Sequence, residues 1–271
     1  MNKTLVLGAT GKTGRRVVDR LIANGVVPRR GSRSEKPRFD WDARDTWPAA
    51  LEGIERVYLS YYPDLSMPGA AETVAAFVEC AISTGVQRLV MLSGRGEPQA
   101  AKCEQLVRES GAEWTIIRCS FFSQNFSESF FLGPVLDGEV ALPVGSVGEP
   151  FVDADDIADV AASALLEDRH VGQIYEVTGP RLLTFEEAIG EISGAVDRRI
   201  RYVQVSPADY SAALVANEVP PEYVALLNYL FTELLDGRNA SLGDGIQRAL
   251  GRPPREFGDY VAATATTWRA A

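Results

Sequence analysis

The sequence predicts an α/β fold, in which a doubly wound parallel sheet is joined to a smaller, mostly helical C-terminal lobe. Short apolar runs rich in valine, isoleucine and leucine alternate with longer amphipathic segments, which is typical of strands and helices that alternate in a parallel sheet. A glycine follows each of three predicted helices, at Gly25, Gly85 and Gly111, as expected where a helix ends and the chain turns back into a strand.

The first 120 residues carry this alternation most regularly. The clearest helix lies at 15–24, where Val17, Val18, Leu21 and Ile22 recur at helical spacing. In order, we expect strands at 4–7, 26–32, near Phe39, 56–60, 88–92 and 114–118, and helices at 15–24, 70–84 and 99–110.

The pattern changes after residue 118. Residues 119–149 mix aromatic residues with glycine and proline, and we expect a loop-rich insertion there. A helix at 153–166, with Asp153 or Asp155 as its N-cap and acidic residues in its first turn, precedes one more strand of the sheet at 173–178. The rest is expected to be helical, with Ser206 and Pro207 as an N-cap and first helical residue and an apolar helix face over 222–235.

Composition excludes several classes of protein. The chain has 271 residues and a net charge of −10, which argues against a nucleic acid or an anionic membrane as a partner. No apolar run approaches the roughly 20 residues of a membrane span, and the N-terminus does not resemble a signal peptide, so we expect a cytoplasmic protein. The three cysteines are far apart in sequence and are expected to be buried small hydrophobes, with neither a disulfide nor a metal site.

The single histidine limits the possible mechanisms. His170 lies in a polar stretch that predicts a surface loop, and nothing beside it indicates a catalytic role. A Ser-His-Asp triad or a histidine-rich metal site is therefore not expected.

Three glycines between the first strand and the first helix indicate a dinucleotide-binding turn. Gly8 permits a tight turn, Gly11 allows backbone N–H groups to approach a pyrophosphate, and Gly14 allows the helix to pack closely on the strand. The spacing excludes an ATP-binding loop of the Walker type, because no glycine stands at the required distance before Gly11. The sequence therefore predicts a Rossmann-type domain over 1–120, completed by 151–178, and a substrate lobe over 121–150 and 179–271.

The end of the second strand indicates which dinucleotide is bound. An acidic residue is usual there in proteins that accept the free ribose of NAD(H), but this chain has Ser32 and Arg33 and no acid until Glu35. An arginine and a serine suit a 2′-phosphate through charge-assisted hydrogen bonds. NADP(H) is therefore the predicted cofactor, although one of Arg29 and Arg30 is expected to face solvent.

The sequence resembles the NmrA-like branch of the atypical short-chain dehydrogenase/reductases, and within it the ergot-alkaloid-type reductases. The stretches that carry the resemblance span nearly the whole chain. They are 8–13, 32–34, 38–41, 57–59, 92–93, 122–128, 150–158 and 251–255.

The resemblance implies a role for each of a set of residues. Thr10, Lys12 and Thr13 would line the pyrophosphate, and the acidic and aromatic residues at 40–42 would lie along the adenine edge. Ser60 and the tyrosines after it would pass over the nicotinamide-side ribose, and Ser93 with Gly94 would approach the nicotinamide. The residues expected to bind the cofactor are Gly8, Thr10, Gly11, Lys12, Thr13, Gly14, Ser32, Arg33, Asp40, Trp41, Ser60, Tyr61, Ser93 and Gly94.

One departure from the wider superfamily bears on mechanism. The usual Tyr-x-x-x-Lys pair, whose tyrosine donates a proton to a carbonyl oxygen, is replaced at the expected positions by Gly96 and Ala100. Hydride delivery itself requires no side-chain acid, so iminium ions, quinones and conjugated carbonyls are the expected acceptors. Ser93, Tyr61 and Tyr62 are the weaker candidates for a proton donor.

Aromatic residues predict a flat, apolar acceptor. Those expected to bind it are Tyr62, Phe121, Phe122, Asn125 and Phe151, with Gln124, Phe126, Tyr61 and Met67 as further candidates. For Phe126, Phe130 and Phe131, helical spacing favours the hydrophobic core instead.

Two functions stay open. The first is an NADPH-dependent reductase of a small aromatic or polycyclic electrophile in secondary metabolism, acting as a monomer or homodimer. The alternative is a non-catalytic NADP(H)-binding redox sensor of the NmrA type, which the missing tyrosine and lysine would suit.

Overall fold

The computed structural model describes residues 3–269 and divides into two compact units. Unit 1 comprises Met1–Cys119, Ala154–Val177 and Gly243–Arg252. Unit 2 comprises Ser120–Asp153, Thr178–Leu242 and Pro253–Ala271.

Unit 1 is built on a six-stranded, wholly parallel sheet in the order β2-β1-β3-β4-β5-β7. The bounds are β1 Thr4–Leu7, β2 Arg29–Gly31, β3 Arg56–Leu59, β4 Arg88–Gly94, β5 Glu113–Cys119 and β7 Gln173–Val177. The strand order reverses between β1 and β3. In an open α/β sheet a ligand binds at such a reversal, outside the carboxyl ends of the strands.

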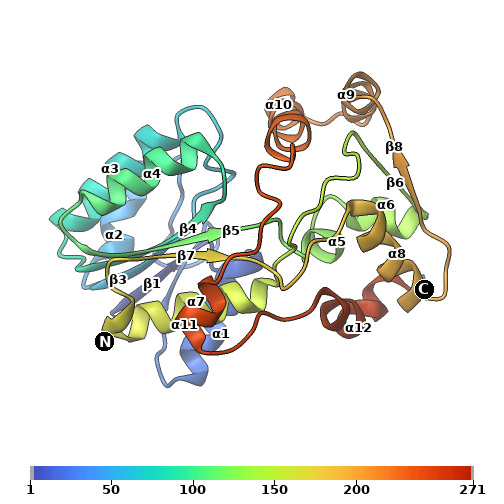
Figure 1. Ribbon diagram of the computed structural model, residues 1–271. Helices are drawn as coiled ribbons and strands as arrows, with labels where there is room; N and C mark the ends of the chain where they lie inside the picture. Colours follow the sequence, from blue (N-terminus) through green and yellow to red (C-terminus); the bar gives the residue numbers. More distant parts are fainter. Residues whose placement is uncertain (1–2, 270–271) are drawn as a thin grey trace. The chain divides into compact units, whose positions relative to one another are not determined.

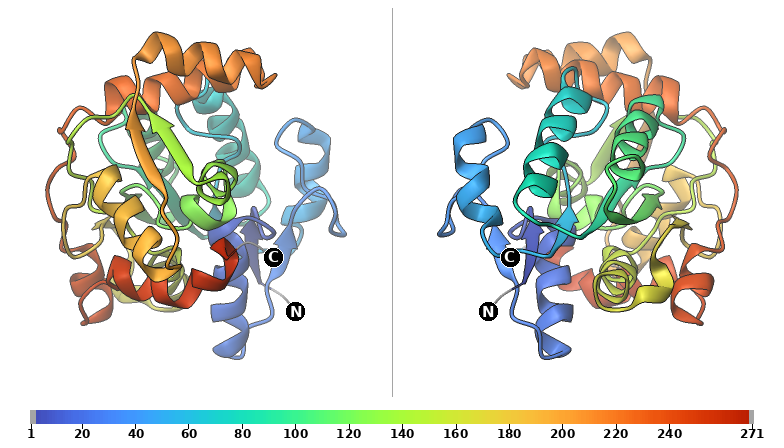
Figure 2. Two further views of the ribbon diagram at one scale, coloured as in Figure 1. Left: turned by 90° about the vertical axis from the view of Figure 1, so that its right-hand side faces the viewer. Right: turned by 90° about the vertical axis from the view of Figure 1, so that its left-hand side faces the viewer.

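Helices cover both faces of this sheet, which confirms the predicted doubly wound α/β class (Figure 1). One face carries α2 (Trp47–Leu51), α3 (Ala70–Ser83) and α4 (Pro98–Arg108), of which α3 and α4 lie side by side (Figure 2, right). The other face carries α1 (Lys12–Ala23), α7 (Ala154–Leu166) and α11 (Gly245–Leu250). Gly25, Gly85 and Gly111 all have a positive φ, as expected of glycines that end helices.

The predicted strand near Phe39 is wrong. Residues 32–43 form turns and irregular backbone, followed by the short 3-10 helix η1 (Arg44–Thr46). The Phe39 ring is buried among Trp41, Trp47 and Phe77, with ring centroids 5.1 to 6.3 Å apart. The aromatic residues at this position therefore fill a core rather than extend the sheet beyond β2.

Unit 2 is mostly helical, but the segment expected to be a loop-rich insertion is partly regular. It contains α5 (Asn125–Glu128), α6 (Leu132–Asp137) and β6 (Glu139–Leu142). Strand β6 pairs in parallel with β8 (Arg201–Gln204), which the sequence analysis also missed (Figure 2, left). The remaining elements are α8 Phe185–Ala195, α9 Pro207–Ala216, α10 Pro221–Tyr229, the π-helical turn η3 Leu230–Leu234 and α12 Phe257–Trp268.

Helix starts were predicted with mixed success. Ser206 caps α9, its hydroxyl accepting a hydrogen bond from the Asp209 N–H, and Pro207 opens the helix as predicted. Asp155 and Asp156 lie in the first turn of α7. Besides lying near the positive end of the helix dipole, both acids form ion pairs. Asp155 pairs with arginines of α1, and the fully buried Asp156 pairs with Arg252.

The predicted surface loop at His170 is also wrong. The side chain is fully buried, with Nε2 2.8 Å from Ser163 Oγ and Nδ1 2.8 Å from Tyr175 Oη. The polar neighbours suggested a loop, but Arg169, for example, donates hydrogen bonds to the Glu167 carboxylate and to the Ala249 carbonyl oxygen. His170 is thus a hydrogen-bonded core residue that ties β7 to α7.

This burial predicts a dependence of stability on pH. Burial and the charge of Arg169 lower the pKa of His170, so below the ordinary value of about 6.5 the unfolded chain binds a proton that the folded chain resists. Relative to His170→Gln, we expect the native chain to lose up to about 1.4 kcal/mol of unfolding free energy per pH unit as the pH falls through this range. Denaturant titrations between pH 5 and 8 measure the difference, and parallel curves for the two proteins would contradict it.

Candidate cofactor-binding site

The glycine turn lies directly after β1 and has the geometry of a phosphate cradle. Gly8 has a φ of +63°, and its carbonyl accepts a hydrogen bond of 2.8 Å from the Gly11 N–H. Gly11 is the N-cap of α1 and has no side chain to cap the N–H groups of the first helical turn. Those N–H groups and the positive end of the helix dipole suit a pyrophosphate.

Gly14 permits the close approach of α1 to this turn. A Cβ placed on Gly14 would lie 2.1 Å from the Gly8 carbonyl oxygen and 2.6 Å from its carbon. Both are backbone atoms, which have no freedom to move aside without displacing the turn. The third glycine of the motif is therefore required by packing.

The carboxyl ends of neighbouring strands bring the predicted cofactor residues to one edge of the sheet. Ser60 follows β3, and its Oγ is 3.6 Å from the position that a Cβ on Gly8 would take. Ser32 follows β2, whereas Ser93 and Gly94 end β4. Together these residues line the edge at which the strand order reverses, the expected place for a dinucleotide.

The three arginines near β2 have different surroundings. Arg29 donates hydrogen bonds to the carbonyl oxygens of Ala50 and Glu52, so it is part of the scaffold. Arg30 lies 3.9 Å from Glu35. Arg33 is exposed, 5.8 Å from the centre of the Tyr62 ring, and within residues 3–269 no carboxylate forms an ion pair with it. Arg33 is thus the arginine best able to bind a phosphate.

Asp40 and Trp41, predicted for the adenine edge, are built into the local fold. Asp40 accepts hydrogen bonds from Arg38 and from the Asp42 N–H; burial alone would raise its pKa, but these bonds lower it. The Trp41 indole donates to the Ser60 carbonyl oxygen, and its ring lies 4.9 Å from that of Tyr61. Through these contacts of Trp41 with Ser60 and Tyr61, the adenine side of the predicted site is joined to the loop after β3.

Ser93 is held by a buried ionic group that the sequence analysis missed. Its hydroxyl donates a hydrogen bond of 2.6 Å to Glu104, a residue of α4 that is 2 % exposed. The same carboxylate accepts three hydrogen bonds of 2.6 to 3.0 Å from Arg118 of β5. The Ser93 proton therefore points at Glu104, which leaves Ser93 poorly placed to donate it elsewhere.

The two tyrosines after β3 differ in exposure. Tyr61 is partly buried, and burial raises its pKa. Tyr62 is 57 % exposed beside Arg33. Position 96, where the resemblance places the usual tyrosine, is a glycine just before α4, and α4 itself contains no tyrosine.

Two further carboxylates missed by the sequence analysis lie in the loops that follow β3 and β4. The Ser66 N–H donates to Asp64 Oδ1 (2.8 Å), and the Ser66 hydroxyl donates to Glu97 Oε2 (2.6 Å). Burial, followed by the like charge of Asp64, raises the pKa of Glu97 to about 7. The pairing could not be recognised from sequence because the two acids are 33 positions apart and neither belongs to a motif singled out above.

The predicted acceptor residues of unit 2 lie on or near an aromatic core. Phe151 is 2 % exposed and surrounded by other rings, whereas Phe121 and Phe122 are partly buried and Asn125 is 9 % exposed. Phe126 and Phe131 are buried in the core as predicted. Phe130 is not, with an exposed fraction of 42 %.

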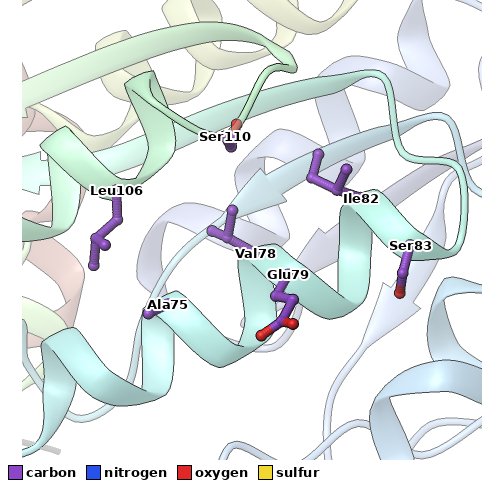
Figure 3. A pocket seen from close by; sticks show the side chains of 7 residues that line it. All are labelled: Ala75, Val78, Glu79, Ile82, Ser83, Leu106 and Ser110. Atoms are coloured by element: carbon purple, nitrogen blue, oxygen red, sulfur yellow. The ribbon is translucent and has the colours of Figure 1, made fainter.

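Other features lie away from this edge. A shallow apolar groove between α3 and α4 is lined by Ala75, Val78, Glu79, Ile82, Ser83, Leu106 and Ser110 (Figure 3). It lies toward the C-terminal ends of both helices, away from the carboxyl ends of the strands.

In the described chain, no three histidine, cysteine or acidic side chains are grouped to hold a metal. None of the helices between residues 3 and 269 has the length and hydropathy that a membrane span requires.

The cysteines are free thiols. Cys103 and Cys119 are buried, as predicted, and Cys80 is partly buried. Burial raises the pKa of Cys103 to about 11. A thiolate at neutral pH is therefore disfavoured at this position.

Comparison with curated sequences finds relatives that cover nearly the whole chain. A (4-alkanoyl-5-oxo-2,5-dihydrofuran-3-yl)methyl phosphate reductase of Streptomyces griseus is 32% identical, covering 95% of this chain and 96% of its own. The uncharacterized oxidoreductase YesF of Bacillus subtilis is 30% identical, covering 98% and 96%. Festuclavine dehydrogenase of Aspergillus fumigatus is 27% identical, covering 97% and 98%. No family model matches the chain.

Solved structures share the fold at lower identity. Citrobacter sp. triphenylmethane reductase complexed with NADP(H) matches with a TM-score of 0.77 and 18% identity, covering 97% of this chain and 99% of that one. The NADPH complex of an Escherichia coli quinone oxidoreductase matches with a TM-score of 0.78 and 19% identity, covering 96% and 99%.

Proposed function

The chain belongs to the NmrA-like branch of the atypical short-chain dehydrogenase/reductases, and on that premise we propose that it is an NADPH-dependent reductase of a small electrophile. The observation that carries the proposal is the glycine cradle at the strand reversal, together with Arg33 after the neighbouring strand, which forms no ion pair within residues 3–269. The relatives named above as a reductase, an oxidoreductase and a dehydrogenase support the reaction class.

The residues of unit 1 fit the cofactor. Backbone N–H groups after Gly11, with Thr10, Lys12 and Thr13, would bind the pyrophosphate, and Ser32 with Arg33 would bind the 2′-phosphate. Ser60, Tyr61, Ser93 and Gly94 would lie along the nicotinamide half. Bound NADPH supplies a hydride, and the protein contributes orientation and, where the acceptor needs one, a proton.

Arg33 is expected to determine the preference for NADPH. A charge-assisted hydrogen bond contributes about 1.5–3 kcal/mol, so Arg33→Ala should weaken NADPH binding roughly 10- to 100-fold and leave NADH binding unchanged. Arg30→Ala is the matched control, since Arg30 is a neighbouring exposed arginine that faces Glu35. Fluorescence titration with both cofactors measures this, and a native chain that binds NADH as tightly as NADPH would contradict the proposed specificity.

We further propose that unit 1 serves the cofactor and unit 2 the acceptor. The sequence-based division, 1–120 with 151–178 for the cofactor and 121–150 with 179–271 for the substrate, differs from these units mainly at residues 243–252, which belong to unit 1. The proposed acceptor residues are Tyr62, Phe121, Phe122, Asn125 and Phe151. Their aromatic character favours a flat, conjugated molecule such as a quinone, an iminium ion or a conjugated carbonyl. The relatives act on a furanone phosphate and on clavine alkaloids by name, which supports conjugated acceptors in secondary metabolism.

A panel of such acceptors tests this directly. Steady oxidation of NADPH, followed by absorbance, is expected with at least one quinone, iminium ion or conjugated carbonyl. A Phe122→Ala variant should raise KM for that acceptor without changing NADPH affinity. Tight NADPH binding with no turnover on the whole panel would overturn the reductase proposal.

The second candidate function is an NADP(H)-binding redox sensor. The specific observation in its favour is that α4 lacks a tyrosine and that the Ser93 hydroxyl is engaged by Glu104. A sensor would bind NADP+ and NADPH with different affinities and change its hydrogen-exchange protection between them, without oxidising NADPH. The same titrations and the acceptor panel therefore separate the two functions.

A further inference from the structure

We propose that Glu97, paired with Asp64, is the proton donor for acceptors whose reduction generates an oxyanion, an inference that rests on the proposed reductase function. The pair would replace the tyrosine that α4 lacks. It would serve neutral quinones and conjugated carbonyls, and it would be dispensable for acceptors that are already cations.

The place of Glu97 in the fold supports this role. It lies in the loop between β4 and α4, three residues beyond the strand end that is expected to approach the nicotinamide. Its Oε1 lies so close to Gly94 that a Cβ placed there would be 1.9 Å away. The carboxyl group thus lies directly against the end of β4, and a glycine at position 94 is what makes room for it.

Asp64 and Ser66 hold this carboxyl group from the neighbouring loop after β3. Ser66 bridges the two acids, donating its N–H to Asp64 and its hydroxyl to Glu97 Oε2. The bridge orients Glu97 and leaves Oε1 as the oxygen that carries the proton. Because the two loops follow adjacent parallel strands, the pair lies at the same edge of the sheet as the cofactor residues.

The charges around the pair explain why it keeps a proton. Within residues 3–269 neither Asp64 nor Glu97 forms an ion pair with lysine or arginine; the nearest arginine in sequence, Arg95, pairs with Glu176. The titratable group that acts on Glu97 is Asp64, and the Ser66 hydroxyl is its other partner. Two partly buried carboxylates without a cation disfavour double ionisation, so one proton is shared.

The other candidate donors are less suitable. The Ser93 proton is directed at Glu104, and Tyr62 is mostly exposed beside Arg33. Tyr61 is partly buried, and burial raises its pKa above the ordinary value of about 10, which makes it a weaker acid than Glu97 at neutral pH.

The proposed step balances in atoms and charge. A neutral conjugated carbonyl that gains a hydride at carbon becomes an oxyanion, because the electron pair of the broken π bond moves to oxygen. That oxygen takes the proton from Glu97 Oε1, which leaves two carboxylates at the pair, and water returns one proton after the product departs. NADPH is oxidised by two electrons and the acceptor is reduced by two.

Direct titration of the protein without cofactor is the first test. Carbon-13 NMR of labelled glutamate side chains should show one resonance, absent from Glu97→Gln, with a midpoint near pH 7. Asp64→Asn should move that midpoint to lower pH, because it removes the like charge. A Glu97 resonance that titrates at the ordinary value of about 4.5 would overturn the proposal whether or not the enzyme turns over.

The second test compares two acceptors in the holoenzyme. Menadione requires a proton, whereas a cationic triphenylmethane dye takes a hydride to give a neutral product and requires none. Glu97→Gln should lower kcat for menadione at least 100-fold and flatten its pH profile, while kcat for the dye changes by less than about threefold. Glu109→Gln, the same change at an exposed position beyond the last turn of α4, is the matched control.

The outcomes distinguish this inference from the proposed function. Equal losses on both acceptors in Glu97→Gln would overturn the proton-donor role and leave the reductase intact. No NADPH oxidation by the native chain with either acceptor would overturn both.

Discussion

Replacing Arg118 by alanine is expected to lower the free energy of unfolding by about 3–5 kcal/mol, measured by denaturant titration at pH 7.5. Arg118 provides three of the hydrogen bonds to the Glu104 carboxylate, whose side chain is 3 % exposed. Without the guanidinium, the buried Glu104 carboxylate would keep, among residues 3–269, only the hydrogen bond from Ser93. The cost is the desolvation of an uncompensated carboxylate rather than the loss of one contact.

Two further variants separate this cause from a general effect of losing an arginine. Arg201→Ala removes an arginine that is 58 % exposed and pairs with an exposed glutamate, so it should cost about 1 kcal/mol or less. Adding Glu104→Leu to Arg118→Ala should recover part of the lost stability, because it removes the unpaired charge as well. A double variant less stable than Arg118→Ala alone would contradict the argument.

Much of unit 1 could be predicted because its signals are local. Strand 4–7 was predicted with the bounds that the structure has, and helix 70–84 ends one residue from its predicted end, since the glycine at 85 marks the turn. The strands β6 and β8 were missed because each has four residues and its partner lies about 60 positions away. Such short strands form because they pair with a distant strand, and the sequence around each strand carries no sign of that partner.

The candidate site also contains residues that local sequence predicts and residues that it does not. The glycine turn and the residues after β2 are contiguous motifs, whose chemistry follows from residue type and position. His170 was misplaced because polar neighbours suggested exposure, while its partners Ser163 and Tyr175 are recognisable only in the folded chain. Glu97 and Glu104 were missed for the same reason, since an isolated glutamate in sequence is indistinguishable from a solvated one.

The two glutamates near α4 illustrate how surroundings assign opposite roles to one side chain. Glu104 is surrounded by donors, Arg118 and Ser93, which stabilise its charged form and fix the end of β4. Glu97, seven positions earlier, has an acid and a hydroxyl as partners, which favours retention of a proton. Arg118→Ala is therefore predicted to affect stability first, whereas Glu97→Gln is predicted to affect proton-dependent turnover.

Gly14→Ala is expected to abolish measurable NADPH binding, with a loss of at least 100-fold in affinity, and to destabilise the chain by about 1–3 kcal/mol. The added methyl group would meet the Gly8 carbonyl at 2.1 Å, so either α1 moves away from β1 or the turn changes shape. Either movement displaces the N–H groups that would bind the pyrophosphate. Fluorescence titration with NADPH and thermal denaturation measure the two effects.

Whether Gly14→Ala lowers or raises the free energy of unfolding shows whether the clash with Gly8 is real. Alanine in a helix interior is favoured over glycine by about 0.8–1.0 kcal/mol, so a helix free of the clash would gain stability from the substitution. Gly190→Ala supplies that comparison, because Gly190 lies inside α8 and a Cβ there would meet nothing within 4 Å. We expect Gly190→Ala to raise the unfolding free energy and leave NADPH affinity unchanged, in contrast to Gly14→Ala. If both variants behaved alike, the close packing of α1 on the turn would not be what holds the phosphate cradle in shape.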